Sequence, residues 1–204
     1  MHDYTNLGEF QKDVIRELGN IGAGNAATAL GKLLNDRIEI TVPALKFIEI
    51  NEISGILGGP ENEAAGIILR LSEDIDGLLV YLMDCDFINH LLGCLICEDV
   101  KDIRSISELG LSALKEVSNI LSGSFVNVLC SFTGSKIRLS LPEIAIDMVG
   151  AILNFPASFA GEMSDQLLLV EVEFILSGDS VQSHLLLIPD IRSLNKIIER
   201  LGVG

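Results

Sequence analysis

The chain repeats itself, and this internal symmetry limits the folds it can adopt more than any other feature. When the sequence is shifted by 99 residues, residues 13–43 align with residues 112–142 without a gap, and seven of the 31 positions are identical. Near the ends of the halves the shift is 106 residues, which places Asp84 on Asp190. Such self-similarity indicates two copies of one structural unit. Both aspartates are suited to the N-cap or the first turn of a closing helix.

Each half, 9–97 and 105–201, has the pattern of a long helix, three strands and a closing helix. The helical period of apolar residues predicts the long helices at 9–34 and 105–131. Because no helix is predicted between consecutive strands, we expect a mainly antiparallel sheet. The prediction is an α+β fold, a single domain over 1–204, in which two pseudo-symmetric α-β-β-β-α halves share a sheet flanked by long helices. The expected strands are 37–50, 64–72, 76–83, 136–149, 167–176 and 181–188.

Pro43 and Pro142 occupy equivalent places in the first β segment of each half. The alternation of apolar residues changes phase at each proline, and proline has no N–H to give to a strand ladder. We interpret both prolines as structural, at a bulge or a strand break.

The charge of the chain excludes several classes of function. Fourteen Lys and Arg against 29 Asp and Glu give a net charge of −15, and 49% of the residues are hydrophobic. This is the profile of a globular protein. The negative balance argues against nucleic-acid binding and against docking on an anionic membrane.

Neither an export signal nor a membrane span is predicted. The first ten residues have no basic segment followed by an apolar one, so they do not resemble a signal peptide. The apolar runs at 78–83 and 185–189 are far shorter than the roughly 18 residues of a spanning helix. We therefore expect a cytoplasmic protein whose four cysteines are reduced.

Each long helix carries a polar stripe of three residues at spacing i, i+4, i+7, which at 100° per residue share an arc of about 60°. A solvated helix face is the plain interpretation. Two facts favour a site: asparagine is a poor helix former, and Glu-x-x-Asn occurs at the same place in both halves. The stripes are Asp13, Glu17 and Asn20 in the first half, and Ser112, Glu116 and Asn119 in the second.

The pattern Asp/Ser-x-x-x-Glu-x-x-Asn, then 22 residues, then Pro, resembles the signature of the CheC-type phosphatases of bacterial and archaeal chemotaxis. Residues 21–42 and 120–141 are the two 22-residue spacers, before Pro43 and Pro142. The resemblance covers essentially the whole chain, and two motifs make it more like CheC than the one-motif relative CheX. It implies hydrolysis of the aspartyl phosphate of the response regulator CheY.

The resemblance also implies roles for the stripe residues. Asn20 and Asn119 would enter the receiver's active site and orient the attacking water, as a glutamine does in GTPases. Glu17 and Glu116 would hold a cation of the receiver, its active-site lysine. The outermost residues of the stripes would serve in docking or at the helix start. No cofactor or metal of the chain's own is expected, because the receiver supplies the divalent ion, Mg²⁺. These outermost residues are Asp13 and Ser112.

Two alternatives remain. The chain could be a weakly catalytic adaptor that mainly binds CheD, the receptor deamidase that the resemblance also implies as a partner. It could also be a small-molecule phosphatase, which the lack of a nucleophile or metal motif disfavours.

The two stripes are not expected to be equally competent. The glycines of residues 21–24 destabilise the helix after Asn20, by about 1 kcal/mol for each Gly relative to Ala. This favours Asn119 as the better site.

Two other motifs are given structural interpretations. The glycines at 19, 22 and 24 lack the Gly-Lys-Ser/Thr of a phosphate loop and no strand precedes them, so close helix packing is expected. Cys94 and Cys97 lack a second ligand pair for zinc, and we expect both thiols in the core.

Overall fold

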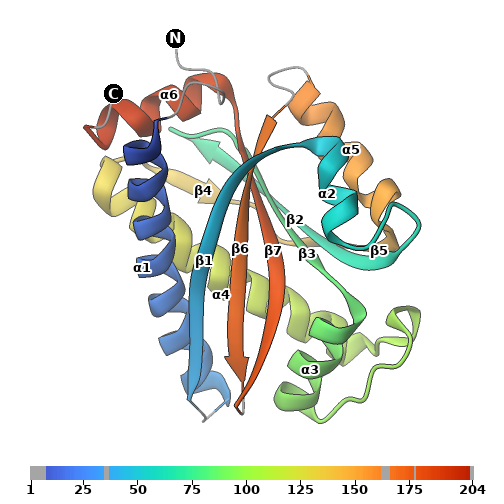
Figure 1. Ribbon diagram of the computed structural model, residues 1–204. Helices are drawn as coiled ribbons and strands as arrows, with labels where there is room; N and C mark the ends of the chain where they lie inside the picture. Colours follow the sequence, from blue (N-terminus) through green and yellow to red (C-terminus); the bar gives the residue numbers. More distant parts are fainter. Residues whose placement is uncertain (1–7, 35–36, 162–165, 177, 203–204) are drawn as a thin grey trace.

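The computed structural model describes the chain except for residues 1–7, 35–36, 162–165, 177 and 203–204 (Figure 1). The first half contains α1 (Glu9–Leu34), β1 (Ile38–Glu49), α2 (Ile50–Ile56), β2 (Glu63–Glu73), β3 (Gly77–Met83) and α3 (Cys85–Ile96). A 3-10 turn (Ile103–Ser105) then precedes the second half: α4 (Glu108–Thr133), β4 (Ile137–Leu139), β5 (Glu143–Met148), α5 (Val149–Gly161), β6 (Gln166–Leu176), β7 (Asp179–Pro189) and α6 (Ile191–Arg200).

One seven-stranded sheet contains strands from both halves. Its order is β1-β6-β7-β3-β2-β4, with β5 also paired to β2. Every pairing is antiparallel, as the sequence predicted. The halves exchange strands: β1 pairs with β6 of the second half, and β4 and β5 pair with β2 of the first.

The register at the centre of the sheet has the symmetry of the sequence. In the central pair of β3 and β7, Val80 lies opposite Leu186, which is its equivalent at the 106-residue shift. A pseudo-two-fold axis therefore passes between these two residues. The edges depart from this symmetry: Ile38 pairs with Leu176, whereas its equivalent Ile137 pairs with Glu73, which corresponds to Asp179 at the 106-residue shift.

Helices cover both faces of the sheet. The larger core lies between the sheet and α1, α3, α4 and α6, and the smaller one lies beneath α2 and α5 (Figure 1). Successive residues of β3 alternate between them: Leu79 and Tyr81 belong to the larger core, Val80 and Leu82 to the smaller. Burial on both faces explains why the central strands are continuous apolar runs.

Helices α2 and α5 were not predicted. The sequence interpretation left the stretch after each first β segment unassigned, but the structure has a helix there in both halves. Seven residues of α2 are too few for a helical period to stand out. In α5, Pro156 lies inside the helix, where proline is normally a breaker. Among the described residues, no helix is long and apolar enough to cross a membrane.

Both prolines behave as predicted. The register of β1 shifts between Thr41 and Ala44, which is a bulge around Pro43. In the second half the strand is broken outright, since β4 ends at Leu139 and β5 begins at Glu143. Pro142 lies in that break.

The predicted N-caps are confirmed. The Asp84 carboxylate accepts a hydrogen bond from the Phe87 N–H at 2.8 Å, and Asp190 accepts one from Ser193 at 2.6 Å. We expect Asp190→Ala to lower the free energy of unfolding by about 1 kcal/mol, because a helix donor loses its acceptor. Urea denaturation measures this change. Asp190→Asn is the control, since asparagine also caps well; an equal loss in both variants would argue against the cap.

Candidate functional site

The stripe of the first half lies on the face of α1 that the core leaves open. Ile15, Leu18 and Gly19 are buried against the rest of the molecule. Between them Glu17 is exposed, and Asn20 is half-buried. The helix therefore presents a carboxylate to solvent and an amide one turn further on, at the boundary between solvent and core.

Helix α4 repeats this arrangement. Its core face includes Leu114, Val117 and Ser118, all fully buried. Glu116 is exposed and Asn119 is half-buried, like their equivalents in α1. Each Glu-x-x-Asn pair thus lies on one face of its own helix, as the sequence predicted.

Asn20 is hydrogen-bonded to the bulge in β1. Its Oδ1 accepts a hydrogen bond of 2.9 Å from the backbone N–H of Val42, the residue before Pro43. Val42 is buried, and its side chain lies close to Gly19. The motif spacing has a structural cause here, because 22 residues after Asn20 the chain returns in β1 beside it. The side-chain carbonyl oxygen of Asn20 accepts this bond, and its amide N–H groups have no partner among the residues that the structure describes, so they are available to a ligand.

The second half lacks the equivalent hydrogen bond. Leu141, the equivalent of Val42, is 84% exposed in the break between β4 and β5. The neighbouring Ser140 instead bonds to Arg70 in β2 through both its N–H and its Oγ. In the described part of the chain, the Asn119 side chain has no hydrogen-bond partner. Both its carbonyl and its amide groups are therefore available.

The remaining stripe residues are on the surface. Asp13 is exposed and forms an ion pair of 2.8 Å with Arg16, three residues on. Ser112 is exposed as well. Helix α1 begins at Glu9, and the N-cap of α4 is Ser107, whose side chain accepts from Gly110. A helix-start role for Asp13 and Ser112 is therefore wrong, and docking remains the prediction.

Pro43 is exposed and Pro142 is buried, so the two motif prolines also differ in environment.

Glu17 and Glu116 form no ion pair within the described residues. Their carboxylates are thus unpaired, which suits them to receive a cation from a partner.

Of the glycines at 19, 22 and 24, Gly22 serves close helix packing as predicted. A Cβ on Gly22 would lie 3.1 Å from the Cα of Phe125 in α4, so the two long helices touch at backbone level. A Cβ on Gly19 would meet Val42 at 3.4 Å. Gly24 is different, because nothing lies within 4 Å of the position of its Cβ.

The prediction that both cysteines of the Cys-x-x-Cys motif lie in the core is wrong for Cys97. Cys94 is half-buried, but Cys97 is exposed. It is the C-cap of α3 and has the left-handed conformation, with φ 58°. Across the ranges that the structure describes, no group of three or more His, Cys, Asp and Glu side chains could hold a metal ion.

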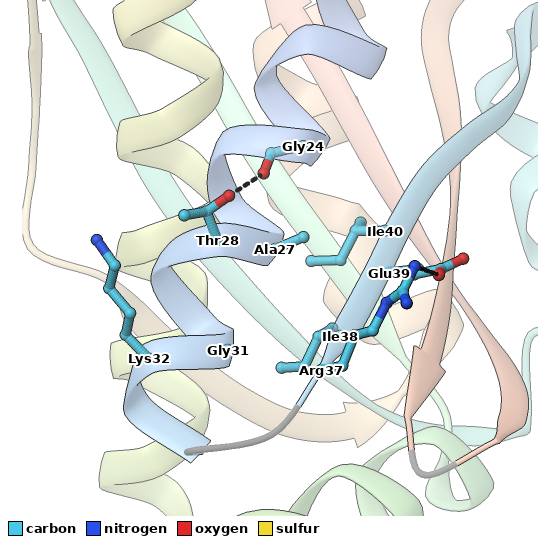
Figure 2. A pocket seen from close by; sticks show the side chains of 9 residues that line it. All are labelled: Gly24, Ala27, Thr28, Gly31, Lys32, Arg37, Ile38, Glu39 and Ile40. Carbon is cyan, nitrogen blue, oxygen red and sulfur yellow. Dashed lines mark hydrogen bonds and ion pairs between the residues drawn. The ribbon is translucent and has the colours of Figure 1, made fainter.

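A groove of about 900 Å³ opens beside the first stripe, between the C-terminal half of α1 and the start of β1 (Figure 2). It begins at Gly24, one turn after Asn20, and Lys32 and Arg37 are among the residues that line it. The sequence analysis missed it, although small residues recur at Gly24, Ala27 and Gly31 of α1. None of the stripe residues lines it, so it is not the candidate site.

The comparisons with known proteins agree with both the motifs and the fold. The model of the CheC-like family matches residues 10–47 and 109–146, the two segments that contain the stripes. The CheY-P phosphatase CheC of Bacillus subtilis (strain 168) is 30% identical over 208 residues, which cover 100% of each chain.

Solved structures share the fold. The Thermotoga maritima protein FliY superposes with a TM-score of 0.76 at 24% identity, covering 97% of this chain and 98% of the other. A chain of the CheX-CheY-BeF3-Mg²⁺ complex from Borrelia burgdorferi matches with a TM-score of 0.52 at 21% identity, covering 83% of this chain and 96% of its own.

Proposed function

Because the chain belongs to the CheC-like family, we propose that it is a CheY-P phosphatase, which hydrolyses the aspartyl phosphate of the response regulator CheY. One observation carries this proposal. Each long helix presents an exposed glutamate and a half-buried asparagine one turn apart, at equivalent places in the two halves. The proposed catalytic residues are Glu17, Asn20, Glu116 and Asn119.

The chemistry suits an asparagine. Its amide cannot take a proton as a general base, but it can orient a water for in-line attack on phosphorus. The bond between phosphorus and the aspartyl oxygen then breaks, which gives inorganic phosphate and a free carboxylate. A carboxylate is a good leaving group, and phosphoryl transfer depends mostly on positioning and electrostatics. The receiver's own Mg²⁺ is expected to supply the electrostatic part.

The glutamates would hold the receiver in place. Glu17 and Glu116 are exposed and lie one turn before the asparagines, where each could pair with a lysine beside the phosphorylated aspartate. Asp13 and Ser112, one further turn out, would contact the receiver at the edge of the interface. We expect the reaction to take place in the cytoplasm, where a chemotaxis response regulator acts.

The glutamates can be tested separately from the asparagines. We expect Glu17→Gln with Glu116→Gln to raise KM for phosphorylated CheY by about tenfold and to leave kcat within about twofold, because a binding ion pair is lost. Steady-state hydrolysis measures both constants. Glu9→Gln with Glu108→Gln is the matched control, since both residues are exposed in the first turns of the same helices. A fall in kcat alone would contradict the binding role.

The decisive experiment follows the decay of phosphorylated CheY with substoichiometric amounts of this protein. We expect at least a tenfold acceleration, equal to about 1.4 kcal/mol of barrier. Chelation of Mg²⁺ should stop the reaction. No acceleration, even with CheD added, would refute the phosphatase proposal.

The alternative function is that of an adaptor, which mainly binds CheD and hydrolyses CheY-P only weakly. It rests on the family resemblance alone. The two functions separate experimentally, because loss of both motif asparagines should abolish hydrolysis and leave CheD binding unchanged. If CheD binding were tight and hydrolysis undetectable, the adaptor function would replace the phosphatase.

A further inference from the structure

Two large apolar side chains are exposed at the start of the long helices. Phe10 in α1 is 67% exposed, and Leu109 in α4 is 63% exposed. They are equivalent at the 99-residue shift, so both halves expose an apolar residue at the same place. Single exposed apolar residues are common on protein surfaces. Exposure in both halves does not by itself mark a binding site, so the position of the two residues relative to the stripes decides.

Both residues lie on the same helix face as the catalytic stripes. At 100° per residue, Phe10 is about 60° from Asp13 and about 20° from Glu17 around the helix axis. Leu109 has the same relation to Ser112 and Glu116. Each apolar side chain therefore continues a stripe by about two turns beyond its glutamate, on the side away from its asparagine.

Another pair on the same helices provides a contrast. Leu33 and Phe132 are also equivalent at the 99-residue shift, and they are 57% and 55% exposed. They lie about 160° away from Asp13 and Ser112 around their helices, on the opposite side from the stripes. The long helices thus expose two matched apolar pairs, and only the pair Phe10 and Leu109 is aligned with the stripes.

We propose that Phe10 and Leu109 are the apolar anchors of the two stripes, each of which docks on an apolar patch beside the active site of the phosphorylated receiver. This inference rests on the proposed function. The anchors are positioning residues, because they lie about two turns from the glutamate and further from the asparagine that would meet the phosphoryl group. With a glutamate between anchor and asparagine, three contacts along one helix face would fix both the depth and the rotation of the helix in the receiver.

An apolar anchor also answers an electrostatic difficulty. The chain carries a net charge of −15, so long-range electrostatics would not attract a partner that is itself acidic. Burial of apolar surface does not depend on net charge and is little affected by salt.

The test measures binding of the full chain to CheY that carries Mg²⁺ and beryllofluoride, a stable analogue of the phosphorylated receiver. We expect Phe10→Ser with Leu109→Ser to raise Kd at least tenfold. The matched control, Leu33→Ser with Phe132→Ser, should leave Kd within twofold. The exchange Phe10→Leu with Leu109→Phe should restore binding, because each site again has a large apolar side chain. In hydrolysis, the anchor variant should raise KM and leave kcat nearly unchanged.

The results of this test distinguish failure of the proposed function from failure of the anchor proposal alone. If the wild-type protein does not bind the loaded receiver at all, the proposed function fails and the anchors fail with it. If the wild type binds and the anchor variant has an unchanged Kd, or the control variant loses as much, the anchors alone are refuted. Circular dichroism and urea denaturation of the variants show that a change in Kd is not a loss of folding.

Discussion

The variant Asn20→Ala with Asn119→Ala should lose all acceleration of CheY-P decay, a fall of about 100-fold or more in kcat/KM. Alanine cannot orient water, and no neighbouring residue of either stripe has an amide to replace the lost one. The helices should stay folded, because both side chains are only half-buried. Decay of phosphorylated CheY measures the rate, and denaturation checks the fold.

The single variants should be unequal. In the structure the side-chain oxygen of Asn20 accepts a hydrogen bond from the Val42 N–H, while the Asn119 side chain has no partner among the residues described. We expect Asn119→Ala to lose most of the activity and Asn20→Ala to lose less than about threefold. Asn25→Ala with Asn127→Ala is the control, since both asparagines are exposed on the same helices. Equal losses in the two single variants would mean that the bond to Val42 does not restrain the first site.

The substitution Gly22→Leu should destabilise the protein by about 3 kcal/mol, the upper end of the usual cost of overpacking. A Cβ on Gly22 would meet the Phe125 backbone at 3.1 Å, and a backbone atom cannot rotate away. The helices α1 and α4 would have to separate, and their contact with the sheet would loosen with them.

Its matched control lies two residues further on. Gly24 has open space where a Cβ would be, so Gly24→Leu should stabilise the helix by about 1 kcal/mol. Urea unfolding of both variants gives the two free energies. If Gly22→Leu were as stable as Gly24→Leu, the close approach of the two long helices would not be a structural requirement.

Much of the fold could be predicted because the same sequence pattern occurs in both halves of the chain. A helical period over 26 residues and an aspartate before each closing helix are local signals, and the structure confirms both. Strand exchange could not be predicted. The alternation of apolar residues shows which face of a strand is buried, but the choice of neighbour depends on contacts between distant segments.

For the candidate site, the sequence predicted which face of each long helix carries the polar residues. Glu17 and Asn20 are at fixed angles on a helix, so their exposure followed from periodicity. The difference between Asn20 and Asn119 did not, because it arises in the strand that passes beside each of them. Val42 and Leu141 are both apolar residues before a proline, yet one is buried in a continuous strand and the other is exposed in a break.

The exchange of strands has a consequence for how such a chain can change over time. Two identical half-length chains, related by a true two-fold axis, could build the same sheet as this single chain does. The present molecule is then comparable to a dimer whose subunits have been fused. In a homodimer every substitution appears twice, whereas here each half can vary alone. One stripe can therefore vary while the other is kept, and the hydrogen bond at Asn20 is the kind of divergence that fusion permits.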